Sequence, residues 1–286
     1  MFFNEILRGV NKKAFKVCTI IGSILCILNA MQSFTAKDPL NEYLNSYIST
    51  PIDEFILFNL SPLSNLFILI LPLIASIAYS DTYFEDIRSG FVKLVCTRYS
   101  KRRYLIIKFV VNFIIAGITY VVPLILNIIV LLLRHPNISE NPILGKLTIY
   151  PTALFSEMFY KNPWAYIGMW ILIYFIYAGA FASVALAVSI FIKNKFIIVA
   201  FPFILCQTMA LFLSIIDKYE YYPLSFLYVS IRQNINIILG VFFVIFISSA
   251  IVFFIGGERR EIYWNLKLYK KSSNIAIDGY YLKYFY

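Results

Sequence analysis

Residues 109–133 read FVVNFIIAGITYVVPLILNIIVLLL, a run without a charged side chain or a histidine. An α-helix rises about 1.5 Å per residue, so a run of this length can cross the ~30 Å hydrocarbon core of a bilayer. Comparable runs lie at about 17–36, 62–80, 166–192, 196–216 and 235–257. The sequence therefore predicts an all-α polytopic membrane protein, with six transmembrane helices in a single transmembrane domain, residues 1–286.

The composition of the whole chain agrees with this prediction. Of its 286 residues 60% are hydrophobic, the mean hydropathy is +0.77, and only 14% are charged, against about 25% in soluble domains. Three lysines precede the first run as in a secretory signal. Cleavage there would leave five spans and a basic C-terminus outside, so we expect an uncleaved anchor.

The net charge of +10 is unevenly distributed along the chain. If both termini are inside, 19 of the 25 Lys and Arg residues fall on the inner side, as the positive-inside rule requires. The basic residues then orient the chain and contact anionic lipid, so nucleic acid is not an expected partner. We expect a multi-pass protein of the cell (plasma) membrane with both termini cytoplasmic, and the abundance of Ile, Asn and Lys favours a bacterial source.

Three segments outside the runs have patterns of their own. Residues 1–16 place apolar side chains on one helical stripe and predict a helix lying in the inner interface, although a basic leader that only sets orientation is an alternative. Residues 217–234 are rich in tyrosine and fit either an interfacial aromatic belt or a re-entrant segment covered by protein. Residues 258–286 are expected to be a cytoplasmic tail.

Within the run 166–192, Gly179, Ser183 and Ala187 recur every four positions. Such a stripe of small residues lets another helix approach closely. The partner helix belongs either to the same chain or to a second copy, and the sequence leaves both open. The amides in the runs, among them Asn112 and Asn127, are expected to hydrogen-bond between helices rather than to bind a substrate.

Motifs for catalysis or cofactor binding are missing. His135 is the single histidine, the four cysteines are scattered, and the sequence has no HExxH, no GxSxG and no glycine-rich phosphate loop. The six runs also contain no ionisable residue, which argues against ion-coupled transport. We therefore expect no enzyme, no metal site and no cofactor on this chain.

The segment 81–108 reads DTYFEDIRSGFVKLVCTRYSKRRYLIIK and separates two very apolar runs. It begins with acids, continues through Gly90, and ends with bases. Phe91, Leu94 and Val95 share one helical face, so the segment predicts a short helix along the inner surface with its polar groups offered to something in the cytosol. Alternatively, its bases only satisfy the positive-inside rule.

This pattern resembles the permease subunits of ABC-2-type transporters. Their second and third spans flank a loop with an acid, three residues, a glycine, an apolar segment, a serine with bases, and a lysine that opens the next span. The chain matches with Asp86-x-x-x-Gly90, Phe91 to Thr97, Ser100-Lys101-Arg102, and Lys108, but Arg98-Tyr99 stands where many members have proline. The six-span plan with an interfacial helix is similar too.

The resemblance implies that 81–108 is a coupling loop whose helix docks on a separate P-loop ATP-binding cassette ATPase. ATP and Mg would be bound by that subunit, and a second permease chain would complete the transporter. The residues implied in partner binding are Glu85, Asp86, Gly90, Phe91, Lys93, Leu94, Thr97, Arg98, Ser100, Lys101 and Arg102. The implied function is export of an amphipathic or hydrophobic cargo, with a peptide or antibiotic (resistance or immunity) as first choice and a lipid or drug next. The alternatives are a stand-alone ion-coupled carrier or channel, and a membrane scaffold or sensor.

Overall fold

The computed structural model describes residues 1–32, 49–137, 149, 153–229 and 233–281, with side chains up to residue 259. The regular secondary structure of the described part is all helical, without a β-strand. Its α-helices are α1 (Phe2–Asn11), α2 (Lys13–Gln32), α4 (Pro62–Leu69), α5 (Leu71–Tyr79), α6 (Thr82–Arg88), α7 (Phe91–Cys96), α8 (Lys101–Arg134), α9 (Ser156–Lys161), α10 (Pro163–Val188), α11 (Lys195–Ile215) and α12 (Ile235–Tyr281). Two 3-10 turns, η1 (Tyr219–Tyr221) and η2 (Ser225–Leu227), stand between α11 and α12.

Five helices among the described residues are long and apolar enough to cross a membrane. They are α2, α8, α10, α11 and the first part of α12, to Arg259. The segments Pro62–Leu69 and Leu71–Arg88 meet at a bend of 46° and would add a sixth span if they cross as one. Pro72, in the first turn of α5, cannot donate a backbone hydrogen bond there, which accounts for the break at Ile70.

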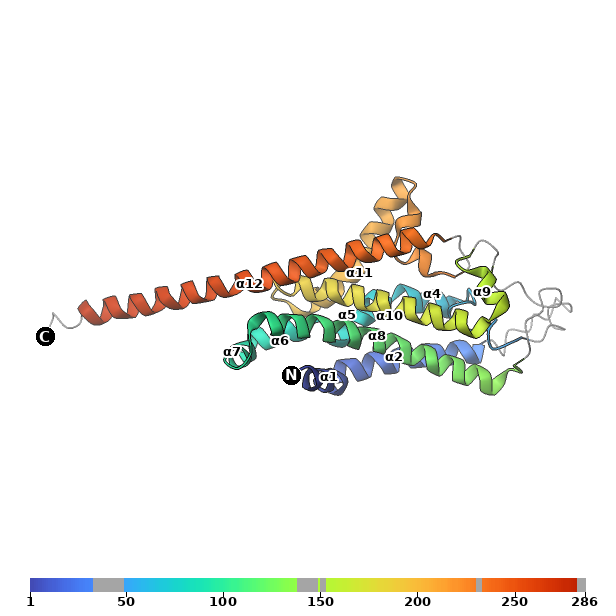
Figure 1. The fold of residues 1–286 in the computed structure, drawn as a ribbon, viewed down its shortest axis with the longest axis horizontal. Helices are drawn as coiled ribbons and strands as arrows, with labels where there is room; N and C mark the ends of the chain where they lie inside the picture. The colour runs from blue at the N-terminus through green and yellow to red at the C-terminus, as the bar shows by residue number, and fades with distance from the viewer. Residues whose placement is uncertain (33–48, 138–148, 150–152, 230–232, 282–286) are drawn as a thin grey trace.

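The helices extend beyond several of the predicted limits. α8 begins eight residues before the predicted run 109–133 and so includes its preceding charged residues. The helix through α5 and α6 likewise runs to Arg88 instead of ending at residue 80. The interfacial helix is shorter than 1–16, because the backbone is extended at Lys12. α12 continues to Tyr281 as one helix past the bundle, and residues 33–36 of the first predicted run lie outside the described residues (Figure 1).

α8 and α10 form the centre of the bundle. They are the candidate spans with the largest buried shares, 50% and 61%, whereas α11 and α12 are each 22% buried. Their contact is reciprocal: Gly117 of α8 lies against the ring of Phe175, and Gly179 of α10 lies against the ring of Phe113. The glycines leave room for the facing rings, which interlocks the two helices.

This contact shows where the predicted stripe of small residues lies. Gly179, Ser183 and Ala187 are all buried inside this chain. The packing interpretation of the stripe therefore describes this chain, and none of the three residues is available at a surface for a second copy.

Two non-helical segments fold back into the bundle. Residues 222–227 are buried, and the Tyr174 hydroxyl of α10 donates to the carbonyl of Leu227 at 2.9 Å. The segment 50–58 is also largely buried, where the Asn127 amide bridges the amide N–H of Ile56 and the carbonyl of Cys26. The protein thus covers both segments, as irregular backbone at membrane depth requires, and the re-entrant interpretation for the middle of 217–234 stays a prediction.

Candidate functional site

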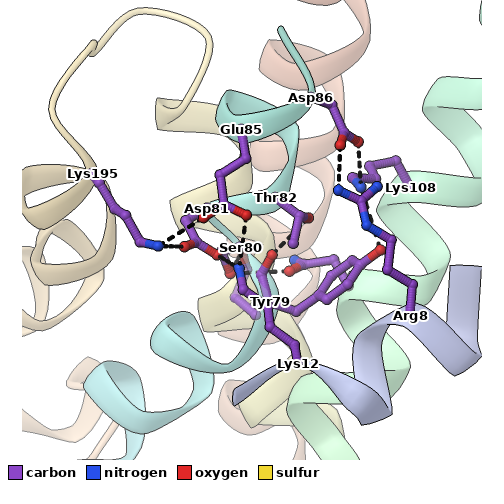
Figure 2. A network of polar contacts seen from close by, with 12 residues as sticks. Arg8, Lys12, Tyr79, Ser80, Asp81, Thr82, Glu85, Asp86, Lys108 and Lys195 are labelled. Atoms are coloured by element: carbon purple, nitrogen blue, oxygen red, sulfur yellow. Dashed lines mark hydrogen bonds and ion pairs between the residues drawn. The ribbon is translucent and has the colours of Figure 1, made fainter. Parts of the chain in front are cut away.

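Figure 2 shows the polar cluster at the end of the bundle where α1, α6, the start of α8 and the start of α11 meet. The sequence places the acids at 81–86 in a loop, but they lie on the last turns of the helical segment Leu71–Arg88, beyond the bend. Asp81 and Asp86 are buried, with relative exposures of 1% and 0%, and Glu85 is half-buried. The acids therefore face other helices rather than the solvent.

Lys108 is the centre of the deeper half of the cluster. Its ammonium nitrogen lies 2.5 Å from Oε1 of Glu5 and 2.7 Å from Oδ2 of Asp86. It also donates to the hydroxyl of Tyr79 at 3.3 Å, so three acceptors face the three ammonium protons. A buried charge is tolerated only when it is paired and hydrogen-bonded in this way.

Asp86 is held from three sides. Arg8 of α1 donates to Oδ1 at 2.6 Å, and the Tyr104 hydroxyl donates to Oδ2 at 2.7 Å beside Lys108. Partial burial acts to lower the pKa of Arg8, but the hydrogen bond and the charge of Asp86 outweigh it and raise the pKa of Arg8 above its ordinary value. Arg8 therefore stays charged and ties α1 to the end of α6.

The second half of the cluster joins α11 to the same helix. Asp81 pairs with Lys12 and with Lys195, whose ammonium nitrogen lies 2.6 Å from Oδ2. Glu85 pairs with the same two lysines, at 3.3 Å from Lys12 and 2.8 Å from Lys195, and accepts a hydrogen bond from Lys195. Figure 2 shows Lys195 approaching from one side of α6 and Lys108 from the other.

The two halves together, which we call the charge network, contain as many acids as bases. The acids are Glu5, Asp81, Glu85 and Asp86, and the bases are Arg8, Lys12, Lys108 and Lys195. Because each charge has an opposite partner, the network connects four helices without leaving a charge uncompensated in a low-dielectric region.

Gly90 connects α6, which carries part of the charge network, to α7. Gly90 has φ of 75°, in the left-handed region, and a side chain there would meet nothing within 4 Å. The glycine is thus needed for the backbone turn and not for space. Across the joint, the guanidinium of Arg8 lies over the ring of Phe91, 5.2 Å from its centroid, so α1 also contacts α7.

α7 is a surface helix without a buried residue. Val92 and Val95 pack toward the bundle, while Leu94 points away with a relative exposure of 70%. Of the predicted apolar face, Val95 therefore packs toward the bundle, whereas Phe91 and Leu94 are exposed, so this chain covers the face only in part.

The structure separates the residues that the resemblance grouped together. Asp86 belongs to the buried network, and Glu85 is engaged there with Lys12 and Lys195. The remaining residues lie on or beside α7 at the surface. Gly90 and Lys101 are half-buried, and the others are exposed: Phe91, Lys93, Leu94, Thr97, Arg98, Ser100 and Arg102. Arg102 pairs with Glu258 of α12 at 2.8 Å.

Sequence reasoning missed the partners of the acids. Glu5 and Arg8 come from α1 and Lys12 from the residue that follows it, where only the apolar stripe was used for prediction. Lys195 is the first residue of α11. One signal was available: Tyr104 and Lys108 are four residues apart and so share one face of a helix. Among the described residues, no group of three or more His, Cys, Asp or Glu side chains could hold a metal ion.

Comparison with curated proteins and with solved structures gives no match. A family model described as "Protein of unknown function (DUF2705)" matches residues 17–223. This range includes the acids of α6, Lys108 and Lys195, and it leaves out α1 and α12. Since the match covers well over half of the sequence, the chain belongs to the DUF2705 family.

Proposed function

We propose that the protein is the membrane-spanning permease subunit of an ATP-driven exporter, whose ATP-binding subunit is a separate chain that docks on α7. The bundle lies in the plasma membrane with six spans, the bent pair counting as one, and with both termini and α7 on the cytoplasmic side. The excess of Lys and Arg in the segments at this end supports that orientation.

The observation that carries the proposal is the position of α7. A surface helix with an outward leucine suits a groove on a partner, since short helices are commonly recognised by apolar anchors set into grooves. The bases that surround it, among them Lys93, Arg98 and Arg102, would contact the rim of such a groove.

The charge network gives a physical route from α7 to the spans. α7 joins α6 at Gly90, and Asp86 of α6 is bonded to α1 and α8, while Asp81 is bonded to α11. A displacement of α7 by a partner therefore acts on four helices at once. Two permease chains would move against one another in this way as the ATPase subunits close on ATP and Mg.

The cargo follows from the apolar, aromatic spans. They suit an amphipathic or hydrophobic molecule better than a small ion, and we place a peptide or antibiotic first and a lipid or drug next. Export of such a molecule would serve antibiotic resistance or immunity.

Purification of the tagged chain from native membranes in mild detergent, followed by mass spectrometry, tests the proposal. We expect a stoichiometric P-loop ATPase to copurify with the wild type and to be lost with Leu94→Asp. The matched control is Leu60→Asp, a leucine 60% exposed at the opposite end of the bundle, which should retain the ATPase.

Three other results would contradict the proposal. A chain that purifies without an ATPase and carries an ion-driven flux in proteoliposomes would be a stand-alone carrier. A chain that binds the ATPase without stimulating it would be a scaffold or sensor. Equal capture by the wild type and by Leu94→Asp would remove α7 from the docking site.

A further inference from the structure

A cavity of about 820 Å³ lies at the end of the bundle opposite α7. The segment just before α9, the turns η1 and η2, and the beginning of α12 form its walls (Figure 1). Its size falls within the range of about 300–1,000 Å³ that small-molecule sites occupy.

The walls of this cavity, which we call the η cavity, are apolar at the base and aromatic at the rim. Leu154, Phe226 and Ile238 line it and are buried, so its base belongs to the hydrophobic core. Phe155 and Tyr219 line the rim with relative exposures of 51% and 48%. The rim therefore presents two aromatic side chains to whatever enters.

Most polar side chains in the walls are occupied by the protein itself. Ser225 donates to the carbonyls of Tyr219 and Tyr222. The Gln233 amide donates to the carbonyls of Phe226 and Tyr228, and the Asn234 side chain caps α12 by accepting from the amide N–H of Asn236. These groups shape the cavity and have little capacity left for a ligand.

Glu220 is the exception. Glu220 is one of the residues that line the η cavity, it is exposed on the turn η1, and no hydrogen bond or ion pair joins its side chain to another residue in the described part of the chain. An ionised carboxylate beside aromatic side chains attracts a cation twice, by its charge and through the electron-rich ring faces. The apolar base offers room for a hydrophobic body.

We propose that the η cavity binds an amphipathic cation, with its charge at Glu220, its positive centre against the ring of Tyr219, and its apolar body over Phe226 and Ile238. A neutral apolar molecule would fill the base without using Glu220. An anion would be repelled by the carboxylate. The negative charge of Glu220 thus favours a positively charged ligand.

This proposal does not depend on the ATP-driven transport proposed above. The η cavity is formed within one chain, and binding can be measured on the purified protein without an ATPase or a second permease. Absence of binding would leave the α7 docking result intact, and absence of an ATPase would leave the binding result intact.

The test measures binding of tetraphenylphosphonium to the full chain in lipid nanodiscs by titration calorimetry. We expect saturable binding at one site per chain, weakened about fivefold by Glu220→Gln, the upper range for an exposed ion pair. Tyr219→Leu, which keeps an apolar side chain but removes the ring, should weaken binding about three- to fivefold.

The matched control is Asp217→Asn. This carboxylate is exposed three residues from Glu220 and does not line the cavity, and its φ of 58° is tolerated by asparagine. Its affinity should stay within about twofold of the wild type, because a screened charge outside the site contributes little. Equal losses from Asp217→Asn and Glu220→Gln would mean a general surface field and would overturn the proposal.

Two measurements on the wild type keep the test independent of whether the variants fold. Neutral triphenylphosphine oxide should bind at least fivefold more weakly than the cation, and raising the salt from 0.05 to 0.5 M should weaken binding of the cation. Equal affinity for the two probes, binding insensitive to salt, or only non-saturable uptake by the nanodisc would each contradict a cation site.

Discussion

The ammonium nitrogen of Lys108 lies 2.7 Å from Oδ2 of Asp86, and neither side chain is exposed to solvent. These are the lysine and the acid of the motif that resembles the ABC-2-type permeases. In this structure Asp86 of α6 and Lys108 of α8 contact one another directly. Their role is thus to fix the end of α6 against α8, which positions α7 without either residue reaching the surface.

Lys108→Met tests how strongly the protein depends on this contact. The change leaves Glu5 and Asp86 buried with fewer cationic partners, so we expect a loss of about 3–5 kcal/mol in the free energy of unfolding. Unfolding in micelles followed by circular dichroism measures it. Arg102→Met, which removes an ion pair from side chains 82% and 47% exposed, should cost at most about 1 kcal/mol. Similar losses for both variants would contradict the burial argument.

Gly179→Ala tests the interlocked contact of α8 and α10. An added Cβ would lie 2.4 Å from the ring of Phe113, so overpacking should destabilise the protein by about 1–3 kcal/mol. Gly168→Ala in the same helix meets nothing within 4 Å and should be neutral or slightly stabilising. Adding Phe113→Leu to Gly179→Ala should recover part of the loss. A greater loss from Gly168→Ala would argue against this packing.

Substitutions of Gly90 test whether this residue is needed for its backbone conformation or for direct contact with the partner. Because its φ is 75°, Gly90→Ala should cost about 1–2 kcal/mol through the left-handed backbone, whereas Gly90→Asn should cost less. ATPase capture and thermal stability are measured for both variants and compared. We expect the asparagine variant to capture more ATPase than the alanine variant. The reverse order would mean that the partner touches this position directly.

Cys96 reports the side of the membrane on which α7 lies. It is the only cysteine that is not buried, since Cys18, Cys26 and Cys206 are all enclosed by the bundle. A membrane-impermeant maleimide should label inverted vesicles and leave sealed cells unlabelled. Leu60→Cys in a Cys96→Ser background should show the opposite pattern, because residue 60 directly precedes α4, which lies away from α7 along the bundle (Figure 1). Labelling of Cys96 from outside would reverse the proposed orientation.

Local patterns in the sequence predicted the helical architecture. The long apolar runs mark the candidate spans, and the stripe through Gly179 correctly indicated close helix packing. The N-terminal helix forms, and Phe3 and Leu7 of its apolar stripe are exposed, while its position in the membrane interface stays a prediction.

The charge network could not be predicted in the same way. Glu5 and Lys108 are 103 residues apart, and Arg8 and Asp86 are 78 apart, so no local window contains both members of a pair. A cluster of acids after an apolar run is typical of a loop, and only the contacts of α1, α8 and α11 explain its burial. The orientation of Leu94 was equally hidden, because six residues of helix do not reveal which neighbour covers which face.

The pairing of Glu5 and Arg8 with much later residues constrains the order in which the chain is assembled. During synthesis the first helix emerges long before Asp86 and Lys108 exist, and until then its charges remain hydrated. It can take its final place only after α6 and the beginning of α8 have been made. α1 is thus made before α6 and α8, and it can be seated only after both of them are present.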